Sequence, residues 1–138
     1  MIAETSWVHN MEHKLEVGLQ LQEDYVIKRE HASKSVGSGE VEVLSTPSMI
    51  AFIEQTSRRC VQPKLPIEHT TVGIRVDVRH LKPVPIGEKL SVTTTLIEIN
   101  NRKLTFEVKA EWQNKTIGVG RHERFIVNKK KFLQKIMD

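Results

Sequence analysis

The chain has 138 residues, enough for one domain with a real hydrophobic core but too few for two domains of ordinary size. Hydrophobic residues make up 38% of it, and no apolar run approaches the roughly 20 residues that span a bilayer, so we expect a soluble protein without membrane contact. The net charge of +4 is mild and aromatic residues reach only 5%, which argues against a nucleic-acid-binding module.

The first residues predict a tail and no export signal. We expect residues 1–12 to be a poorly tied terminus and residues 13–138 to form a single domain. The start lacks the basic flank and unbroken apolar stretch of a signal peptide, and the lone Cys60 forms no internal disulfide, so both favour the cytosol. His9 and His13 have the spacing of a helical metal pair, but two imidazoles without a third ligand predict no metal site.

Two strands are predicted before the first long helix. From Lys14, the stretch "KLEVGLQLQEDYVI" alternates apolar and polar residues, which is the period of a half-buried strand. The stretch "SVGSGEVEVLS" then predicts a short strand that enters the helix, with glycines that permit a bend.

A helix is predicted over "TPSMIAFIEQTSRRC". Ser45 or Thr46 can cap its free N–H groups, and Pro47 suits the first helical position. Apolar residues recur at steps of three and four, so one broad face should be buried. Glu54 lies at the edge of this face, which is an unusual place for a carboxylate. Prolines at positions 63 and 66 end the helix.

The second half predicts an antiparallel sheet. The stretch "HTTVGIRVDVRHL" alternates Val72, Ile74, Val76 and Val78 on one face, and three more β-branched or aromatic runs follow. The links "INNRKL" and "WQNKTI" suit tight hairpins, so the last three strands should form a meander. One long helix on one face of a curved antiparallel sheet is an α+β hot-dog fold.

Three stretches resemble the fluoroacetyl-CoA thioesterase-like family of hot-dog proteins: "TPSMIAFIE", "VGIRVDVRHLKPVPIGEKLSV" and "GVGRHERFIV". A Thr, a Glu eight positions later and a His twenty-six positions after that reproduce the catalytic set of the family. The resemblance therefore implies that Thr46, Glu54 and His80 are catalytic, and that Gly73 and Arg124 line or support the substrate site. It also implies a homodimer that completes each site from two subunits, with no metal or organic cofactor.

These residue types suit thioester hydrolysis. The reaction needs an attacking oxygen, a base or nucleophile, and donors for the developing oxyanion. Glu54 could serve as base or nucleophile, and its apolar neighbours should raise its pKa. His80 could protonate the leaving thiolate or polarise the carbonyl. Thr46 could hold the attacking water or the carboxylate, or could itself attack the carbonyl. We therefore predict an acyl-CoA thioesterase. A non-catalytic acyl-CoA-binding or regulatory domain is the alternative, and a hydratase or dehydratase ranks third because its Asp–His motif is missing from the strand-to-helix entry.

Each candidate also has a structural alternative. Thr46 could only cap the helix, and Glu54 could pair with Arg58 one turn later. His80, placed by alternation on the face of Val76 and Val78, could be a structural histidine. Gly73 could serve backbone geometry alone. Arg124 could pair across strands with a carboxylate at position 107 or 111.

Two further features bear on the substrate. The family's fluoroacetate-specific member has bulky aromatics ahead of the helix, whereas this chain has "EHASKSVGSGEVEV" there, which predicts a more open acyl pocket and no fluoroacetyl specificity. Basic residues could attract the phosphates of coenzyme A, or could form an ordinary solvated face. The candidates are Arg58, Arg59, Lys82, Lys129 and Lys130.

Overall fold

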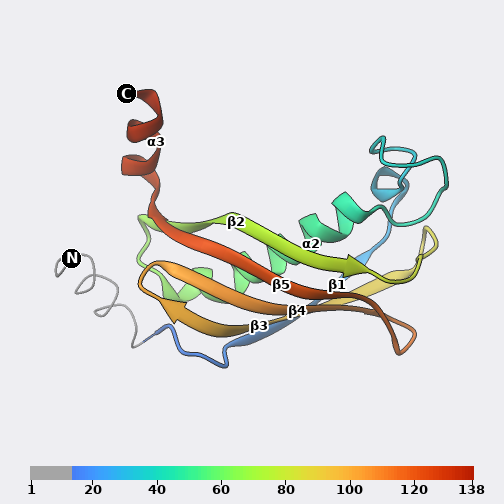
Figure 1. The fold of residues 1–138 in the computed structure, drawn as a ribbon, viewed down its shortest axis with the longest axis horizontal. Coiled ribbons are helices and arrows are strands. Elements are labelled where there is room, and N and C mark those ends of the chain that lie inside the picture. Colours follow the sequence, from blue (N-terminus) through green and yellow to red (C-terminus); the bar gives the residue numbers. More distant parts are fainter. Residues whose placement is uncertain (1–13) are drawn as a thin grey trace.

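The fold is one antiparallel sheet wrapped around one long helix (Figure 1). The computed structural model describes residues 14–138, so the predictions for residues 1–12 and for the His9/His13 pair lie outside the described residues. The elements are β1 Gln20–Val26, η1 Arg29–His31, α2 Thr46–Val61, η2 Gln62–Lys64, β2 His69–His80, β3 Lys89–Asn100, β4 Lys103–Trp112, β5 Lys115–Asn128 and α3 Lys129–Met137. This confirms the predicted α+β hot-dog architecture. In the described part of the chain, no helix is long and apolar enough to cross a membrane.

The strand order in the sheet is β1-β3-β4-β5-β2, so β1 and β2 are the edge strands. Strands β3, β4 and β5 are antiparallel neighbours, which confirms the predicted meander. Asn101, Gln113 and Asn114 have φ values of 57°, 50° and 61°. These left-handed turn residues close the two predicted hairpins, because such turns match the twist of the strands that they join.

The segment before α2 differs from the prediction. The structure has one strand there, β1, and it begins at Gln20 instead of near Lys14. The second predicted strand is wrong: its stretch consists of turns, with isolated bridges between Ala32 and Leu44 and between Val43 and Pro85. The glycines that we expected to bend a strand instead accompany turns, and Gly37 has a φ of +75°.

Strand β2 contains a register shift that the sequence pattern hides. The pairing with β5 slips between Gly73 and Arg75, which is a β-bulge. Residues directly opposite each other share a face, so the bulge moves the inward positions from odd to even numbers. The alternation is therefore right for Val76 and Val78 but wrong before the bulge, and Ile74 is 50% exposed.

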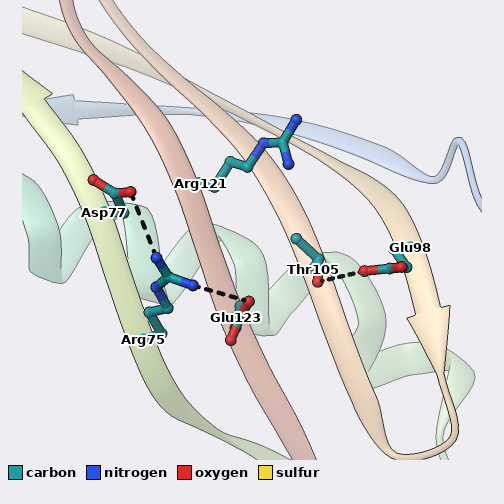
Figure 2. A pocket seen from close by; sticks show the side chains of 6 residues that line it. All are labelled: Arg75, Asp77, Glu98, Thr105, Arg121 and Glu123. Carbon is teal, nitrogen blue, oxygen red and sulfur yellow. Dashed lines mark hydrogen bonds and ion pairs between the residues drawn. The ribbon is translucent and has the colours of Figure 1, made fainter.

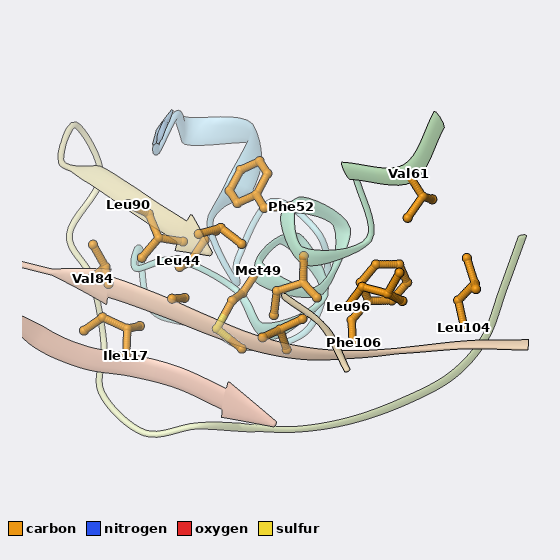
Figure 3. Close-up of a cluster of buried hydrophobic side chains, with 14 of the residues drawn as sticks. Leu44, Met49, Phe52, Val61, Val84, Leu90, Leu96, Leu104, Phe106 and Ile117 are labelled. Atoms are coloured by element: carbon orange, nitrogen blue, oxygen red, sulfur yellow. The ribbon is translucent and has the colours of Figure 1, made fainter. Parts of the chain in front are cut away.

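Helix α2 is capped by Ser45, whose hydroxyl accepts a hydrogen bond from the Ser48 N–H at 3.1 Å. Such a cap contributes about 1 kcal/mol to stability. The buried face of the helix presents Met49, Phe52 and Ile53 to the sheet, as expected. They join a core of fully buried side chains that includes residues of every strand from β3 to β5 (Figure 3). This packing fixes how α2 lies across the sheet.

Candidate active site

Thr46 and His80 meet at one end of the molecule. Thr46 is the first residue of α2, His80 is the last residue of β2, and Thr46 Oγ1 lies 2.8 Å from His80 Nδ1. Gly118 is opposite His80 on β5, and a Cβ there would overlap the sulfur of Met49. The missing side chain thus lets the first turn of α2 approach the sheet. Thr46 itself is exposed.

The environment of His80 favours the neutral imidazole. Burial lowers the pKa of His80 below its ordinary value of 6.5, and the backbone of Lys82 acts in the opposite direction. Its Nε2 is buried and forms no hydrogen bond of good geometry within the described residues. A neutral imidazole can accept a proton, so the hydrogen bond to Thr46 has the geometry of a base beside a hydroxyl.

Glu54 lies about two turns further along α2, and its carboxylate lies over Gly73 of β2. Its Oε2 is 3.6 Å from Arg124 Nη1, and its side chain is 41% exposed. A Cβ at Gly73 would overlap this same Oε2 and also crowd Arg124 and His122. Gly73 has no positive φ, so it is needed here for space and not for backbone conformation.

Arg124 is a buried cation with fixed hydrogen bonds. Only 5% of the residue is exposed, its Nε donates to Thr71 Oγ1 at 2.7 Å, and its Nη2 donates to the Thr71 carbonyl at 2.9 Å. Burial lowers the pKa of Arg124, while Glu54 raises it. A buried guanidinium needs a compensating charge, and Glu54 supplies it.

The five predicted site residues form two clusters. Thr46 and His80 make the first, and Glu54, Gly73 and Arg124 make the second. Eight residues of helix separate Thr46 from Glu54, which is about 12 Å along the axis. The structure therefore does not bring the whole Thr/Glu/His set together within one chain.

Two structural alternatives are wrong. Ser45 caps α2, so the Thr46 hydroxyl is left to contact His80. Arg124 pairs with Glu54 on the inner side of the sheet instead of with a carboxylate of β4. For Gly73, the space that Glu54 needs explains the glycine better than backbone geometry does.

The sequence reasoning missed Thr71 and His122, which hold Arg124 in place. His122 is completely buried, and its Nε2 lies 3.1 Å from Arg124 Nη1. A signal was present: residues 122 and 124 are two apart on a strand and so share a face. For Thr71 the bulge after Gly73 obscured the inward face.

A separate pocket of about 370 Å³ lies on the other face of the sheet (Figure 2). Its residues Arg121 and Glu123 alternate with His122 and Arg124 along β5, so they point away from α2. Arg75 lies 3.8 Å from Asp77 and 3.9 Å from Glu123, so these charges largely balance one another. This pocket is distinct from the two predicted clusters.

The basic candidates are spread over the molecule. Lys82 lies two residues after His80, and Arg58 is one turn beyond Glu54 on α2. Arg59 pairs with Glu23 at 3.1 Å. Lys129 and Lys130 begin α3, next to the opposite end of β2 from His80 (Figure 1).

Comparison with known proteins gives a family match over most of the chain. Residues 26–130 match the FlK family, described as fluoroacetyl-CoA-specific thioesterase. The chain belongs to this family. It is 30% identical over 95 residues to the fluoroacetyl-CoA thioesterase of Streptantibioticus cattleyicolor, an alignment that covers 69% of this chain and 68% of that protein.

Solved structures agree with this placement in the FlK family. The fluoroacetyl-CoA thioesterase FlK superposes with a TM-score of 0.84 at 26% identity, covering 89% of this chain and 96% of that one. A hot-dog-like protein from Thermanaerovibrio acidaminovorans superposes with the same TM-score at 19% identity, covering 93% and 95%. The second likeness shows the hot-dog fold alone.

Gly73→Ala tests whether space at this position holds Glu54 in place. We expect turnover of the best acyl-CoA ester to fall by about 10- to 100-fold, because a displacement of about 1 Å in an active site can have that effect. The melting temperature should also fall, since a displaced carboxylate compensates the buried Arg124 guanidinium less well. Steady-state kinetics and thermal unfolding measure the two effects. Wild-type turnover in a folded Gly73→Ala protein would contradict the role assigned to the contact.

Proposed function

We propose that this protein is an acyl-CoA thioesterase that hydrolyses a thioester to a carboxylic acid and free coenzyme A. Membership of the FlK family makes thioester hydrolysis its reaction class. The observation that carries the proposal is the contact between the exposed Thr46 hydroxyl and the neutral His80 imidazole, 2.8 Å apart. A nucleophile within hydrogen-bond reach of its base is the arrangement that acyl transfer needs.

In the first step, His80 Nδ1 takes the proton of Thr46 as the hydroxyl oxygen attacks the thioester carbonyl. The carbon–sulfur bond then breaks, and the imidazolium returns the proton to the leaving thiolate. In the second step, Glu54 takes a proton from water, which attacks the acyl ester, and that proton passes to the departing Thr46 oxygen. Arg124 keeps the carboxylate in place for this role, through the 3.6 Å contact with Oε2.

Segments next to the Thr46–His80 contact support proposals for where the coenzyme and acyl ends of the substrate bind. Lys82 is the basic candidate nearest to His80 in the chain, and we propose it for the coenzyme A phosphates, because an ammonium attracts phosphate by charge. Residues 33–42, just ahead of α2, are turns and bends with mostly exposed small and polar residues, which supports an open acyl pocket without fluoroacetyl preference. A cytoplasmic location, where coenzyme A esters would be available, is part of the proposal.

A homodimer would bring the two clusters together. Strand β2 is an edge strand of twelve residues, and it exposes Ile74 and Val76. A long edge strand with unpaired backbone groups can pair with another strand. Antiparallel pairing of β2 with its copy about Val76 would direct His80 of one protomer toward Gly73 of the partner subunit. The Glu54 that activates water for Thr46 is then the partner's Glu54.

A catalytically silent acyl-CoA-binding domain remains the second candidate. The separation of about 12 Å between Thr46 and Glu54 within one chain favours it, because a single protomer does not assemble the full set. A Glu54 variant that loses turnover but still binds acyl-CoA would support the thioesterase, because a silent domain has no turnover to lose.

Glu54→Gln should lower turnover by about 10² to 10⁴-fold while the protein still binds acyl-CoA, because the amide keeps the shape but cannot take a proton. Thiol release from a panel of acyl-CoA esters and calorimetric binding measure the two quantities. Glu107→Gln, an exposed carboxylate of β4, is the matched control and should retain wild-type kinetics. A wild-type protein that binds acyl-CoA but releases no thiol would favour the silent binding domain. Full turnover in Glu54→Gln would assign Glu54 to a structural role.

Ile74→Lys should weaken the dimer, because a charged side chain on an edge strand opposes pairing with a second strand. Sedimentation equilibrium should give a dimer for the wild type at micromolar concentration and a shift toward monomer for the variant. Ile67→Lys places the same charge on an exposed loop residue outside β2 and should leave the dimer intact. A monomeric wild type would rule out the shared site.

A further inference from the structure

His122 is a completely buried polar side chain that the proposed chemistry does not use. It lies on β5 opposite Val76, and its ring stacks near Phe106 with 6.3 Å between ring centroids. Burying an imidazole is unfavourable unless its nitrogens have hydrogen-bond partners. Both nitrogens do have partners, and those partners define its chemical state.

The two hydrogen bonds of His122 require one tautomer. Nδ1 lies 2.8 Å from the carbonyl oxygen of Arg75, which can only accept, so Nδ1 carries the proton. Nε2 lies 3.1 Å from Arg124 Nη1, which can only donate, so Nε2 is the acceptor. The ring is therefore neutral. Burial and the Arg124 charge both lower the pKa of His122, while the Arg75 backbone, Glu54 and Glu123 raise it, with a net lowering.

The bond from Arg124 to His122 is the third anchor of the guanidinium, beside the two bonds to Thr71. Nε and Nη2 are both bonded to Thr71, so Nη1 is the group that remains to reach Glu54. Nη1 carries two N–H bonds in the plane of the guanidinium, at a fixed angle to each other. When one of them donates to His122, only the other is available to the Glu54 carboxylate, whose Oε2 lies 3.6 Å from Nη1.

We propose that His122 is a positioning residue, which accepts a hydrogen bond from Arg124 and thereby sets the orientation of the Glu54 carboxylate. The inference rests on the proposed function of Glu54 in thioester hydrolysis. In this role His122 does not contact the substrate. It accepts a hydrogen bond from Arg124, and Arg124 pairs with Glu54. Its second bond, to the carbonyl of Arg75, ties the same ring to the bulge of β2 that follows Gly73.

Two substitutions separate positioning from a purely structural role. His122→Asn keeps a donor near the place of Nδ1 for the Arg75 carbonyl but has no acceptor for Arg124. His122→Gln keeps an acceptor near the place of Nε2 but has no donor for Arg75. If His122 positions Arg124, His122→Asn should lose about 10- to 100-fold in kcat with little change in KM, and His122→Gln should recover most of that loss. If His122 only supports the bulge, kcat should fall further in His122→Gln than in His122→Asn, and that result would overturn the proposal.

Proton–nitrogen correlation spectra of the imidazole give a readout that is independent of activity. At neutral pH, the wild type should show a protonated Nδ1 and an unprotonated Nε2 for His122. A protonated Nε2 would overturn the proposal whether or not the protein hydrolyses thioesters. Conversely, an unchanged kcat in His122→Asn beside a strongly reduced kcat in Glu54→Gln would overturn the positioning role while the thioesterase function stands.

Discussion

The ion pair between Glu54 and Arg124 is the interaction on which the arrangement of this molecule depends. Arg124 is buried between the sheet and α2, where an uncompensated guanidinium would be strongly unfavourable. The carboxylate that compensates it comes from the helix, and the absence of a side chain at Gly73 leaves room for its observed position. The unusual carboxylate at the edge of an apolar helix face is thus explained by a cation below it. Any function assigned to Glu54 has to operate from this held position.

The same constraint explains the local irregularity of β2. The bulge after Gly73 turns the second half of the strand over, so that Val76, Val78 and His80 face inward. A regular strand would have pointed residue 80 to the opposite side from Gly73. The bulge therefore allows one edge strand to present both a glycine beneath Glu54 and an imidazole beside Thr46 on the same face. His122, bonded to the carbonyl of Arg75, links the bulge to Arg124.

Most of the fold could be predicted from the sequence, because local signals agreed with the global arrangement. The periodicity of α2, the Asn-containing hairpins and the β-branched runs each specify one element. The second strand before α2 was wrong because its alternation is short and no neighbouring strand pairs with it. The faces of Val72 and Ile74 were wrong because a bulge leaves no signature in an alternating pattern.

The resemblance to the family proposes a set of candidate site residues, and the structure adds their geometry. Thr46, Glu54 and His80 match the spacing of the family's catalytic set, but spacing in the sequence does not place three side chains together. The helix between Thr46 and Glu54 keeps these two about 12 Å apart within one chain. His122 was overlooked because its importance depends on the partners of Arg124, which are contacts between β5 and β2 far apart in the chain.

The most direct test of a site built from two subunits is complementation between two inactive variants. Chains carrying Glu54→Gln and chains carrying His80→Ala are co-expressed with different tags, and the mixed dimer is purified through both. If the set is shared across the interface, each mixed dimer contains one intact site and one doubly defective site, so it should recover about half of the wild-type turnover per dimer. If all three residues act within one chain, the mixed dimer should be as inactive as its parents, and that result would contradict the account.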